Sequence, residues 1–407
     1  MQKEKLVPAI RFKGFSEEWS KEKIKELTTF RRGSFPQPYG EEKWYSGPGA
    51  MPFVQVADVG NALSLNSMTN QLISKIAMPF SVFVPKDSVI VTLQGTIGRV
   101  ALTNYDCFID RTILYFDSYR KLLDKTLFAI LIKNKFEQEA LLAPGAVIKT
   151  ITKQELNNFE LTMPNFNEQQ KIGQFFSNLD SLIHSQELKL ENLQTIKQSL
   201  LDKMFALYDQ KVPEIRFKGF DESWKLNKFS DLYNSSNEKN INIRYTEKNI
   251  ISVANMYFKD EQKISNAEYL KSYNIFHLGD IAYEGNKSAN YRYGRFVVNT
   301  IGPGIVSHVF EVFKPVMKEY DLYFWKYYIN SESIMRNVLR DSTKSATMMA
   351  TLVKKDLSNQ FIKIASIAEQ QKIGQFFSNL DSLIHFQEQK LEKLNNIKQA
   401  LLEKMFC

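Results

Sequence analysis

Two loops of this 407-residue chain carry side chains suited to contacts with nucleic acid. The first lies in the stretch "LQGTIGRV" between two apolar segments, and its candidate contact residues are Gln94, Gly95, Thr96, Gly98 and Arg99. Gln and Arg side chains form bidentate hydrogen bonds with adenine and guanine edges, and glycines allow a backbone to approach a ligand closely. The stretch predicts a base-contacting loop, and an ordinary hairpin turn is the competing interpretation.

The second loop, "EGNKSANYRYGRF" (284–296), interleaves basic, amide and aromatic residues. Its candidate DNA contacts are Asn286, Lys287, Asn290, Arg292 and Arg295. Basic side chains hold phosphates, whereas amide and guanidinium groups read base edges. A solvated loop without a ligand is the alternative. Shorter polar or basic stretches add the lesser candidates Arg31, Arg32, Lys149, Thr150 and Lys344.

The sequence lacks the motifs of the common catalytic sites. It contains no GxxxxGK[ST] phosphate loop, no HExxH metal motif and no GxSxG serine turn. Cys107 and Cys407 are the only cysteines, too few for a disulfide framework or a metal cage. For His184 and His385 a structural or partner-facing role is favoured over metal binding. We therefore expect neither catalytic residues nor a metal on this chain, although folding could still assemble a carboxylate site.

The composition is that of a folded globular protein. Hydrophobic residues make up 43% and charged residues 24%, and the net charge is +8. The positive excess is +4 over residues 1–166 and +6 over 211–367, a mild bias that also occurs in proteins without a polyanion partner. No apolar run approaches eighteen residues and the N-terminus has no apolar signal region, so we expect a cytoplasmic protein without a membrane span.

A long repeat supplies the elements that must position the two loops. Residues 168–205 and 369–406 align without gaps, with 31 of 38 positions identical. Each copy lacks proline, contains one glycine, and has apolar residues mostly three and four positions apart, which predicts a long helix with one apolar stripe. A continuous helix of this length would span roughly 57 Å. Two such helices can bury their stripes against each other, most simply as an antiparallel pair.

A second, shorter echo precedes each globular stretch: "PAIRFKGF" begins at Pro8 and "PEIRFKGF" at Pro213. In the first stretch, runs rich in β-branched and apolar residues predict strands at 53–59, 88–93, 99–104 and 112–117, followed by a helix at 119–142. In the second, the same criteria predict strands at 280–285, 294–300 and 305–313, and a helix near 320–340. The order of elements is duplicated although the residues scarcely match.

These patterns predict an α+β fold with an internal pseudo-twofold repeat. Two mixed α/β recognition domains are joined by two long helices that form an antiparallel coiled-coil spacer. The expected boundaries are 1–166 for the first recognition domain, 167–207 for the central helix, 208–367 for the second recognition domain and 368–407 for the distal helix.

With these residues in view, the chain resembles the specificity subunit of type I restriction-modification systems over its whole length. The duplicated "EQQKIGQFFSNLDSLI" helices and the "IRFKGF" leads carry the resemblance, and "GTIG" (95–98) matches a glycine loop frequent in the family. The second loop departs from that motif, with "GNKSAN" in its place.

The resemblance implies two target-recognition domains, each reading half of a bipartite double-stranded DNA site, and helices that dock two modification subunits. Those partners would bind S-adenosylmethionine and methylate adenine, and separate restriction subunits would use ATP and Mg; no cofactor is expected on this chain. The residues expected to contact partners are Gln169, Gln170, Phe175, Asp180, Gln370, Gln371, Phe376 and Asp381. Alternatives are a subunit that serves methylation only, a non-DNA helical scaffold with two ligand-binding modules, and a cryptic hydrolase.

Overall fold

The computed structural model describes residues 6–142, 151–259, 267–345 and 349–406, and the chain divides into two compact units. Unit 1 comprises Met1–Ser185 and Leu391–Cys407, and unit 2 comprises Gln186–Lys390. Each long helix therefore contributes to both units. Among the described residues, no helix has the length and apolar character needed to cross a lipid bilayer.

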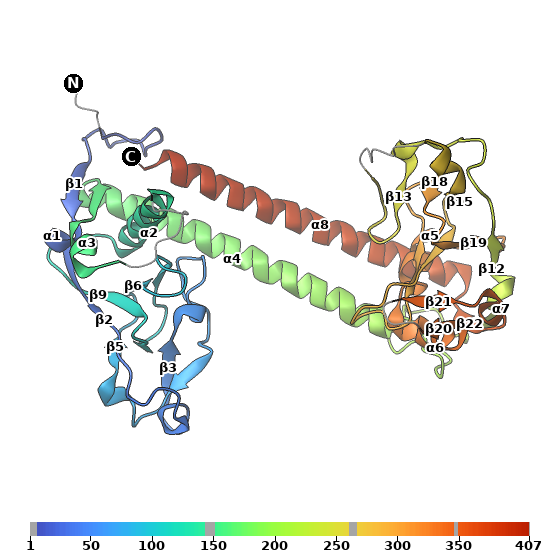
Figure 1. Cartoon of the computed structure of the whole chain (residues 1–407), viewed down its shortest axis with the longest axis horizontal. Coiled ribbons are helices and arrows are strands. Elements are labelled where there is room, and N and C mark those ends of the chain that lie inside the picture. Colours follow the sequence, from blue (N-terminus) through green and yellow to red (C-terminus); the bar gives the residue numbers. More distant parts are fainter. Residues whose placement is uncertain (1–5, 143–150, 260–266, 346–348, 407) are drawn as a thin grey trace. The chain divides into compact units, whose positions relative to one another are not determined.

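Unit 1 is built on two four-stranded sheets (Figure 1). The first has the order β2 (Thr28–Arg32), β9 (Ile113–Tyr119), β6 (Val89–Thr92), β7 (Val100–Leu102), and all its pairs are antiparallel. The second has the order β4 (Gln71–Ile73), β3 (Met51–Val54), β8 (Cys107–Ile109), β5 (Val82–Val84). Strand β6 is buried along its whole length because Val89 and Val91 face the core under helix α2 (Lys125–Leu142), whereas Ile90 faces a second core.

Unit 2 repeats the main sheet with different residues. Its order is β12 (Tyr233–Ser236), β19 (Glu311–Pro315), β16 (Ile281–Glu284), β17 (Arg295–Val298). A two-stranded ribbon recurs as well, β1 (Ser20–Lys23) with β10 (Glu160–Met163) in unit 1 and β11 (Lys225–Lys228) with β22 (Phe361–Ile364) in unit 2. The duplicated α+β architecture expected from the sequence is confirmed.

The remaining elements are short. The helices are α1 (Ile24–Leu27), α3 (Lys153–Asn158), α5 (Leu322–Tyr328), α6 (Glu332–Ser342) and α7 (Lys354–Ser358). The strands are β13 (Ile251–Ser252), β14 (Tyr257–Phe258), β15 (Asn274–Phe276), β18 (Gly304–Val306), β20 (Thr343–Ser345) and β21 (Ala350–Leu352), which pair two by two in unit 2.

Several predicted elements have different bounds in the structure. The helix expected from residue 119 begins at Lys125, because β9 runs on to Tyr119 and the Asp124 carboxylate accepts a hydrogen bond from Leu127 N (2.9 Å). The strand expected at 305–313 is two strands, β18 and β19, separated by a turn. The helix expected near 320–340 is α5 and α6. The first expected strand, 53–59, ends at Val54 and is followed by a single 3₁₀ turn.

The two long helices are α4 (Phe166–Lys203) and α8 (Ile367–Lys404). They run antiparallel in unit 1, where Asp180 pairs with Lys398 (2.6 Å), and in unit 2, where Lys197 pairs with Asp381 (2.6 Å). The two ion pairs are equivalent in the repeat. In the first the aspartate is on α4 and the lysine on α8, and in the second the aspartate is on α8 and the lysine on α4. Within unit 2, the buried Gln387 Nε2 donates to Gln186 Oε1 (2.8 Å), so equivalent glutamines of the two copies meet at the seam. A buried polar pair of this kind fixes helix register.

The identical start of each long helix ties the surrounding elements together. The "PAIRFKGF" and "PEIRFKGF" segments are called the leads of units 1 and 2. In unit 1 the guanidinium of Arg11, in the first lead, donates twice to the buried Glu168 (both 2.6 Å). In unit 2 Arg216 makes the same fork to Glu369 (2.7 and 2.8 Å). The repeated lead therefore exists partly to neutralise a carboxylate that the repeated helix buries.

The single glycine of each long helix marks a close approach to another helix. A Cβ on Gly173 would lie 2.0 Å from the Asp124 carboxylate oxygen that caps α2. A Cβ on Gly374 would lie 2.0 Å from the corresponding oxygen of Asp321, which caps α5. Glycine at this position lets the long helix hold the N-terminus of the next helix and, through it, the main sheet.

Candidate nucleic-acid interface

In unit 1 the predicted base-contacting loop is the turn between β6 and β7. Gln94, Gly95 and Thr96 are exposed at its tip. Gly95 and Gly98 have φ values of +69° and +83°, a region that favours glycine. A Cβ on Gly98 would also lie 2.8 Å from the ring of Phe136 in α2, so this glycine seats the turn on the helix.

Arg99 is half-buried at the base of the same turn. Its guanidinium donates to the carbonyl of Val59 (3.1 Å), and its backbone N donates to Thr92 Oγ1 (3.0 Å). Its Nε is buried without a hydrogen-bond partner among the described residues. Part of the guanidinium that the sequence offers for a base contact therefore holds the loop to the rest of unit 1.

A second turn, between β8 and β9, lies beside this loop, because Leu93 N donates to the carbonyl of Thr112 (2.7 Å). Arg32, at the end of β2, donates through Nε to the backbone carbonyl of Arg111 in that turn. Arg31, one residue earlier, lies 5.4 Å from the centre of the Tyr115 ring and pairs weakly with Asp117 (3.9 Å). The candidates Arg31 and Arg32 thus join the surface around the loop.

The structure adds Tyr39, Gln55 and Arg111 to this surface. The Arg111 guanidinium carbon lies 5.5 Å from the centre of the Tyr39 ring, and Gln55 Nε2 donates to the Tyr39 hydroxyl (2.8 Å). Burial, and to a smaller extent the charge of Asp110, raise the pKa of Tyr39 to about 12, so the phenol stays neutral. No spacing rule pointed to these three residues, because they come from segments far apart in the sequence.

In unit 2 the predicted loop joins β16 to β17, the same connection as in unit 1. Arg295 at its base pairs with Glu284 (2.7 Å), lies over the Tyr291 ring (4.8 Å) and donates to the carbonyl of Ala254 (3.1 Å). Asn290 and Arg292 are both on the loop and both exposed. Arg295 therefore stabilises the loop from within.

The structure describes three further candidate DNA contacts in unit 2. Asn286 is exposed and Lys287 is half-buried with contacts inside the chain. Lys344 is exposed on β20. The remaining candidates, Lys149 and Thr150, lie outside the described residues.

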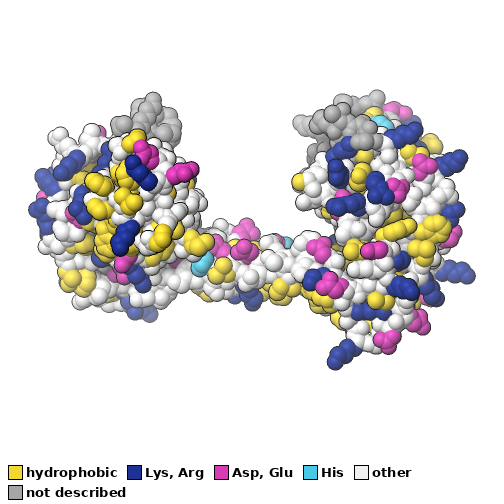
Figure 2. Space-filling model, turned by 90° about the horizontal axis from the view of Figure 1, so that it is seen from below, with side chains coloured by type: hydrophobic (Ala, Val, Ile, Leu, Met, Phe, Trp, Pro, Cys, Tyr) yellow, Lys and Arg dark blue, Asp and Glu magenta, His cyan; other side chains and the backbone are white. Residues whose placement is uncertain are grey.

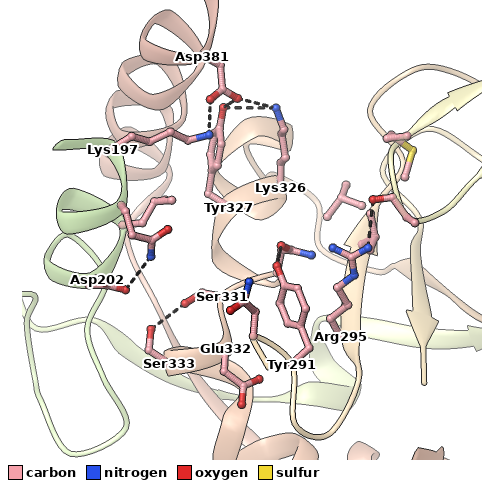
Figure 3. Close-up of a pocket in the computed structure, with 18 of the residues that line it drawn as sticks. Lys197, Asp202, Tyr291, Arg295, Lys326, Tyr327, Ser331, Glu332, Ser333 and Asp381 are labelled. Atoms are coloured by element: carbon pink, nitrogen blue, oxygen red, sulfur yellow. Dashed lines mark hydrogen bonds and ion pairs between the residues drawn. The ribbon is translucent and has the colours of Figure 1, made fainter. Parts of the chain in front are cut away.

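This loop forms one wall of a cavity of about 860 Å³ in unit 2 (Figure 3). Tyr291 and Arg295 line one side and the long helices line another through Lys197 and Asp381. Asp381 accepts hydrogen bonds from Lys197 (2.6 Å), Lys326 (2.9 Å) and the Tyr327 hydroxyl (2.6 Å) (Figure 3). Burial by itself would raise the pKa of Asp381, but these hydrogen bonds together hold it below its usual value. The charges at this wall are largely paired with one another.

The residues expected to contact partners also have contacts inside the chain. Gln169 and Gln370 are buried, and their Oε1 atoms accept from the backbone N of Asp124 and Asp321, each at 3.2 Å. Phe175 and Phe376 are half-buried against Phe12 and Phe217 of the two leads, with ring centres 5.7 Å apart in both units. Asp180 and Asp381 form the ion pairs between the long helices, and Gln170 and Gln371 remain as further expected contacts at the helix starts.

Charge and metal chemistry do not single out another centre in the part of the chain that is described. Figure 2 shows Lys and Arg side chains scattered over the visible face of each unit, interspersed with Asp and Glu, rather than gathered in one patch. No group of three or more His, Cys, Asp or Glu side chains among the described residues is placed to hold a metal ion. The exposed polar loops of the two main sheets remain the best-defined candidate site.

The two units together define a protein that carries one recognition module twice. The family model described as "Type I restriction modification DNA specificity domain" matches residues 16–195 and again 221–396. The chain belongs to this family, and the resemblance inferred from the sequence is confirmed.

Individual relatives agree with the family match. The chain is similar to a type I restriction enzyme MjaIX specificity subunit of Methanocaldococcus jannaschii, 23% identical over 226 residues that cover 53% of this chain and 51% of the relative. The match thus spans about half of that curated relative's length.

Two solved structures share the fold. The specificity subunit of a type I restriction-modification system from M. genitalium matches with a TM-score of 0.62 at 16% identity, covering 99% of both chains. A chain from a structure on the assembly and conformational transition of the type I restriction-modification system matches with a TM-score of 0.52 at 14% identity, covering 95% of this chain and 97% of the other.

Proposed function

We propose that this chain is the DNA-reading subunit of a type I restriction-modification complex, with each unit recognising one half of a bipartite target. The observation that supports this most is that the elements that position the loops are duplicated, whereas the loops themselves differ. The Arg–Glu fork, the capped helix and the main sheet recur in both units. The β6–β7 and β16–β17 loops, at the same place in the topology, differ in length and in residues. One frame therefore presents two different reading surfaces.

The chemistry on DNA belongs to partners in this proposal. Two methyltransferase subunits dock on the repeated helices, bind S-adenosylmethionine and methylate adenine, and ATP- and Mg-dependent restriction subunits complete the complex in the cytoplasm. The fold shared with a chain from an assembled type I restriction-modification system supports partners of this kind. On the long helices, Leu182 and Leu383 are exposed at equivalent positions, as are Ile196 and Ile397, and these offer apolar contacts for two like partners.

Mapping methylated adenines genome-wide tests the proposal. Cells that carry the methyltransferase partner with this chain should show methylation at one bipartite motif, and cells without the chain should lose it. Exchanging the β16–β17 loop residues Asn290 and Arg292 for alanine should alter one half of the motif only. Methylation that persists unchanged without the chain would refute the proposal, as would methyl transfer or DNA cleavage by the purified chain alone.

A further inference from the structure

We propose that Arg111 is a guanine-reading side chain of unit 1, held over the ring of Tyr39 at the edge of the Gln94 loop. The inference rests on the DNA-reading function proposed above. It adds a residue that lies outside the loop motif and between two strands of different sheets.

The turn that carries Arg111 is held rigidly. Asp110 N donates to the carbonyl of Val54 (3.0 Å), Ile113 N donates to the carbonyl of Asp110 (2.9 Å), and the Asp110 carboxylate accepts from Thr112 N (2.9 Å). Gly33 packs against this turn so closely that a Cβ there would lie 2.3 Å from the carbonyl oxygen of Asp110. The backbone of Arg111 therefore has a fixed position relative to β2, β3 and the Gln94 loop.

The ring beneath the guanidinium is also anchored. Tyr39 contacts the buried Phe35 with ring centres 5.1 Å apart, and its hydroxyl accepts from Gln55 (2.8 Å). The neighbouring Pro38 carbonyl accepts from Trp44 Nε1 (3.1 Å). An arginine held by a cation–π contact over a fixed aromatic ring loses less conformational freedom when its planar fork pairs with a base edge.

The guanidinium of Arg111 has more hydrogen-bond donors available for a ligand than that of Arg99. The Arg99 guanidinium is partly used inside unit 1, by its bond to Val59. The Arg111 side chain is exposed, and within the described residues its guanidinium has the Tyr39 ring as its contact and no hydrogen bond or ion pair. A guanidinium that is charged, oriented and unpaired at the rim of a polar loop suits the O6 and N7 acceptors of guanine.

Unit 2 has a related arrangement at the corresponding turn, between β18 and β19. There His308 is exposed and its ring lies edge-on to the ring of Tyr269, with centres 6.2 Å apart. Both units thus place a hydrogen-bonding side chain on a tyrosine at the strand connection that enters the main sheet. The identity of that side chain differs, as expected if the two turns read different half-sites.

Selection from randomised duplexes tests the assignment. The full chain, assembled with its methyltransferase partners, is incubated with a pool of random double-stranded DNA, and the bound sequences of wild type and variants are compared. Arg111→Ala removes the guanidinium fork, so one guanine in one half-site should lose its preference by roughly 5- to 150-fold. Arg120→Ala, at an exposed arginine just beyond the C-terminal end of β9, is the matched control and should select the wild-type motif.

Substitutions of Tyr39 separate stacking from folding. Tyr39→Phe keeps the ring and loses the bond to Gln55, and it should retain the guanine preference. Tyr39→Leu removes the aromatic face, and it should lose much of that preference while the other half-site is still selected with wild-type strength. Equal loss in both Tyr39 variants would overturn the positioning role of the ring.

The outcomes also distinguish the two proposals. If wild type selects no sequence, the proposed function fails. If wild type selects a bipartite motif and Arg111→Ala selects the same motif, the DNA-reading function stands and the role of Arg111 fails. If Arg111→Ala weakens binding to all duplexes alike and lowers the salt dependence by about one ion, Arg111 contacts a phosphate and base reading is overturned.

Discussion

At the scale of single residues, the most demanding feature is the buried carboxylate at the start of each long helix. Glu168 and Glu369 are 0% and 1% exposed, and each is neutralised by an arginine from a lead. Such pairs contribute little net stability compared with an apolar packing, but an unpaired buried charge is costly. The pairs therefore specify where each lead must lie.

Arg216→Ala should destabilise unit 2 by about 3–5 kcal/mol, because it leaves Glu369 buried without its partner. Urea unfolding followed through the fluorescence of the buried tryptophans measures this change. Arg340→Ala removes an exposed arginine whose partner, Asp341, is also on the surface, and it should change the unfolding free energy by less than about 1 kcal/mol. Equal effects of the two substitutions would contradict the assigned role of Arg216.

A second buried carboxylate gives unit 2 a predictable pH response. Burial raises the pKa of Asp280 to about 6, although His277 and Lys314 oppose the rise. Because the folded pKa exceeds the unfolded one, the folded state binds the proton more tightly, and deprotonation of Asp280 reduces stability as the pH rises from about 4 to above 6. Asp280→Asn should remove this penalty, roughly 2–3 kcal/mol at a pH of about 7.5.

Unfolding of wild type and Asp280→Asn at a series of pH values measures that difference directly. The variant should be the more stable of the two above a pH of about 6 and nearly equal to wild type near a pH of about 4, where Asp280 is largely protonated in the folded state. Glu238, His277 and Lys314 lie near Asp280, and all three residues are present in both proteins. A difference that does not depend on pH would contradict the raised pKa.

The sequence indicated the types of residue at the candidate interface better than their roles. Gln94 and Thr96 are exposed on a turn between two strands, as their glycine-flanked motif suggested. The inward hydrogen bond of Arg99 and the cation–π contact of Arg111 with Tyr39 could not be predicted, because they depend on which strands lie side by side. A short motif determines the local turn. The order of the strands in the sheet determines which residues lie next to that turn.

At the scale of elements, the repeated helix start is explained by packing inside each unit. Gly374 allows α8 to contact the capped N-terminus of α5, where a Cβ would lie 2.0 Å from the Asp321 carboxylate and 2.7 Å from Phe324 N. Alanine normally stabilises an exposed helix by about 1 kcal/mol relative to glycine. Gly374→Ala should instead destabilise unit 2 by about 1–2 kcal/mol, because the cap must move.

Urea unfolding checks this sign. Gln375→Ala, at the next and exposed position of α8, is the matched control and should be neutral or slightly stabilising. Stabilisation by Gly374→Ala would show that the contact can relax at no cost.

The long helices were the most predictable elements and the short ones the least. The bounds of the 38-residue repeat lie within two residues of the bounds of α4 and α8. The β18–β19 turn was missed, because the apolar run "IVSHVFEVF" hides a change of direction that Ser307 and Phe310 close with a backbone hydrogen bond (3.1 Å). Identity between the helix copies suggested partner contacts, and buried Glu168 and Gln169 show that packing accounts for part of it.

At the scale of the whole molecule, unit 1 is assembled from both ends of the chain. Met405 is buried in its core, Phe406 packs against Phe176 with ring centres 6.0 Å apart, and Ile10 N donates to the carbonyl of Lys404 (2.9 Å). The corresponding junction in unit 2, Ile215 N with the carbonyl of Lys203 (2.9 Å), is formed within one continuous stretch. The two units are alike in structure and unlike in connectivity.

Deletion of residues 391–407 should therefore destabilise unit 1 selectively. Hydrogen exchange followed by mass spectrometry should show loss of amide protection in β6 and β9, whereas β16 and β19 keep theirs. Glu403→Ser alters an exposed residue of the same segment and should leave both sheets protected. Unchanged protection of β6 and β9 after the deletion would show that α4 alone can complete unit 1.

This discontinuity sets the order in which the protein can mature on the ribosome. Almost all of unit 1 emerges first, then the entire stretch Gln186–Lys390, and only then the segment that closes unit 1. At roughly 5–20 residues per second, that interval is about 10–40 s. For its duration Phe176 lacks its ring contact with Phe406, so the unit that is made first is the last to be completed. Premature termination late in synthesis would therefore damage the N-terminal unit and spare the one made after it.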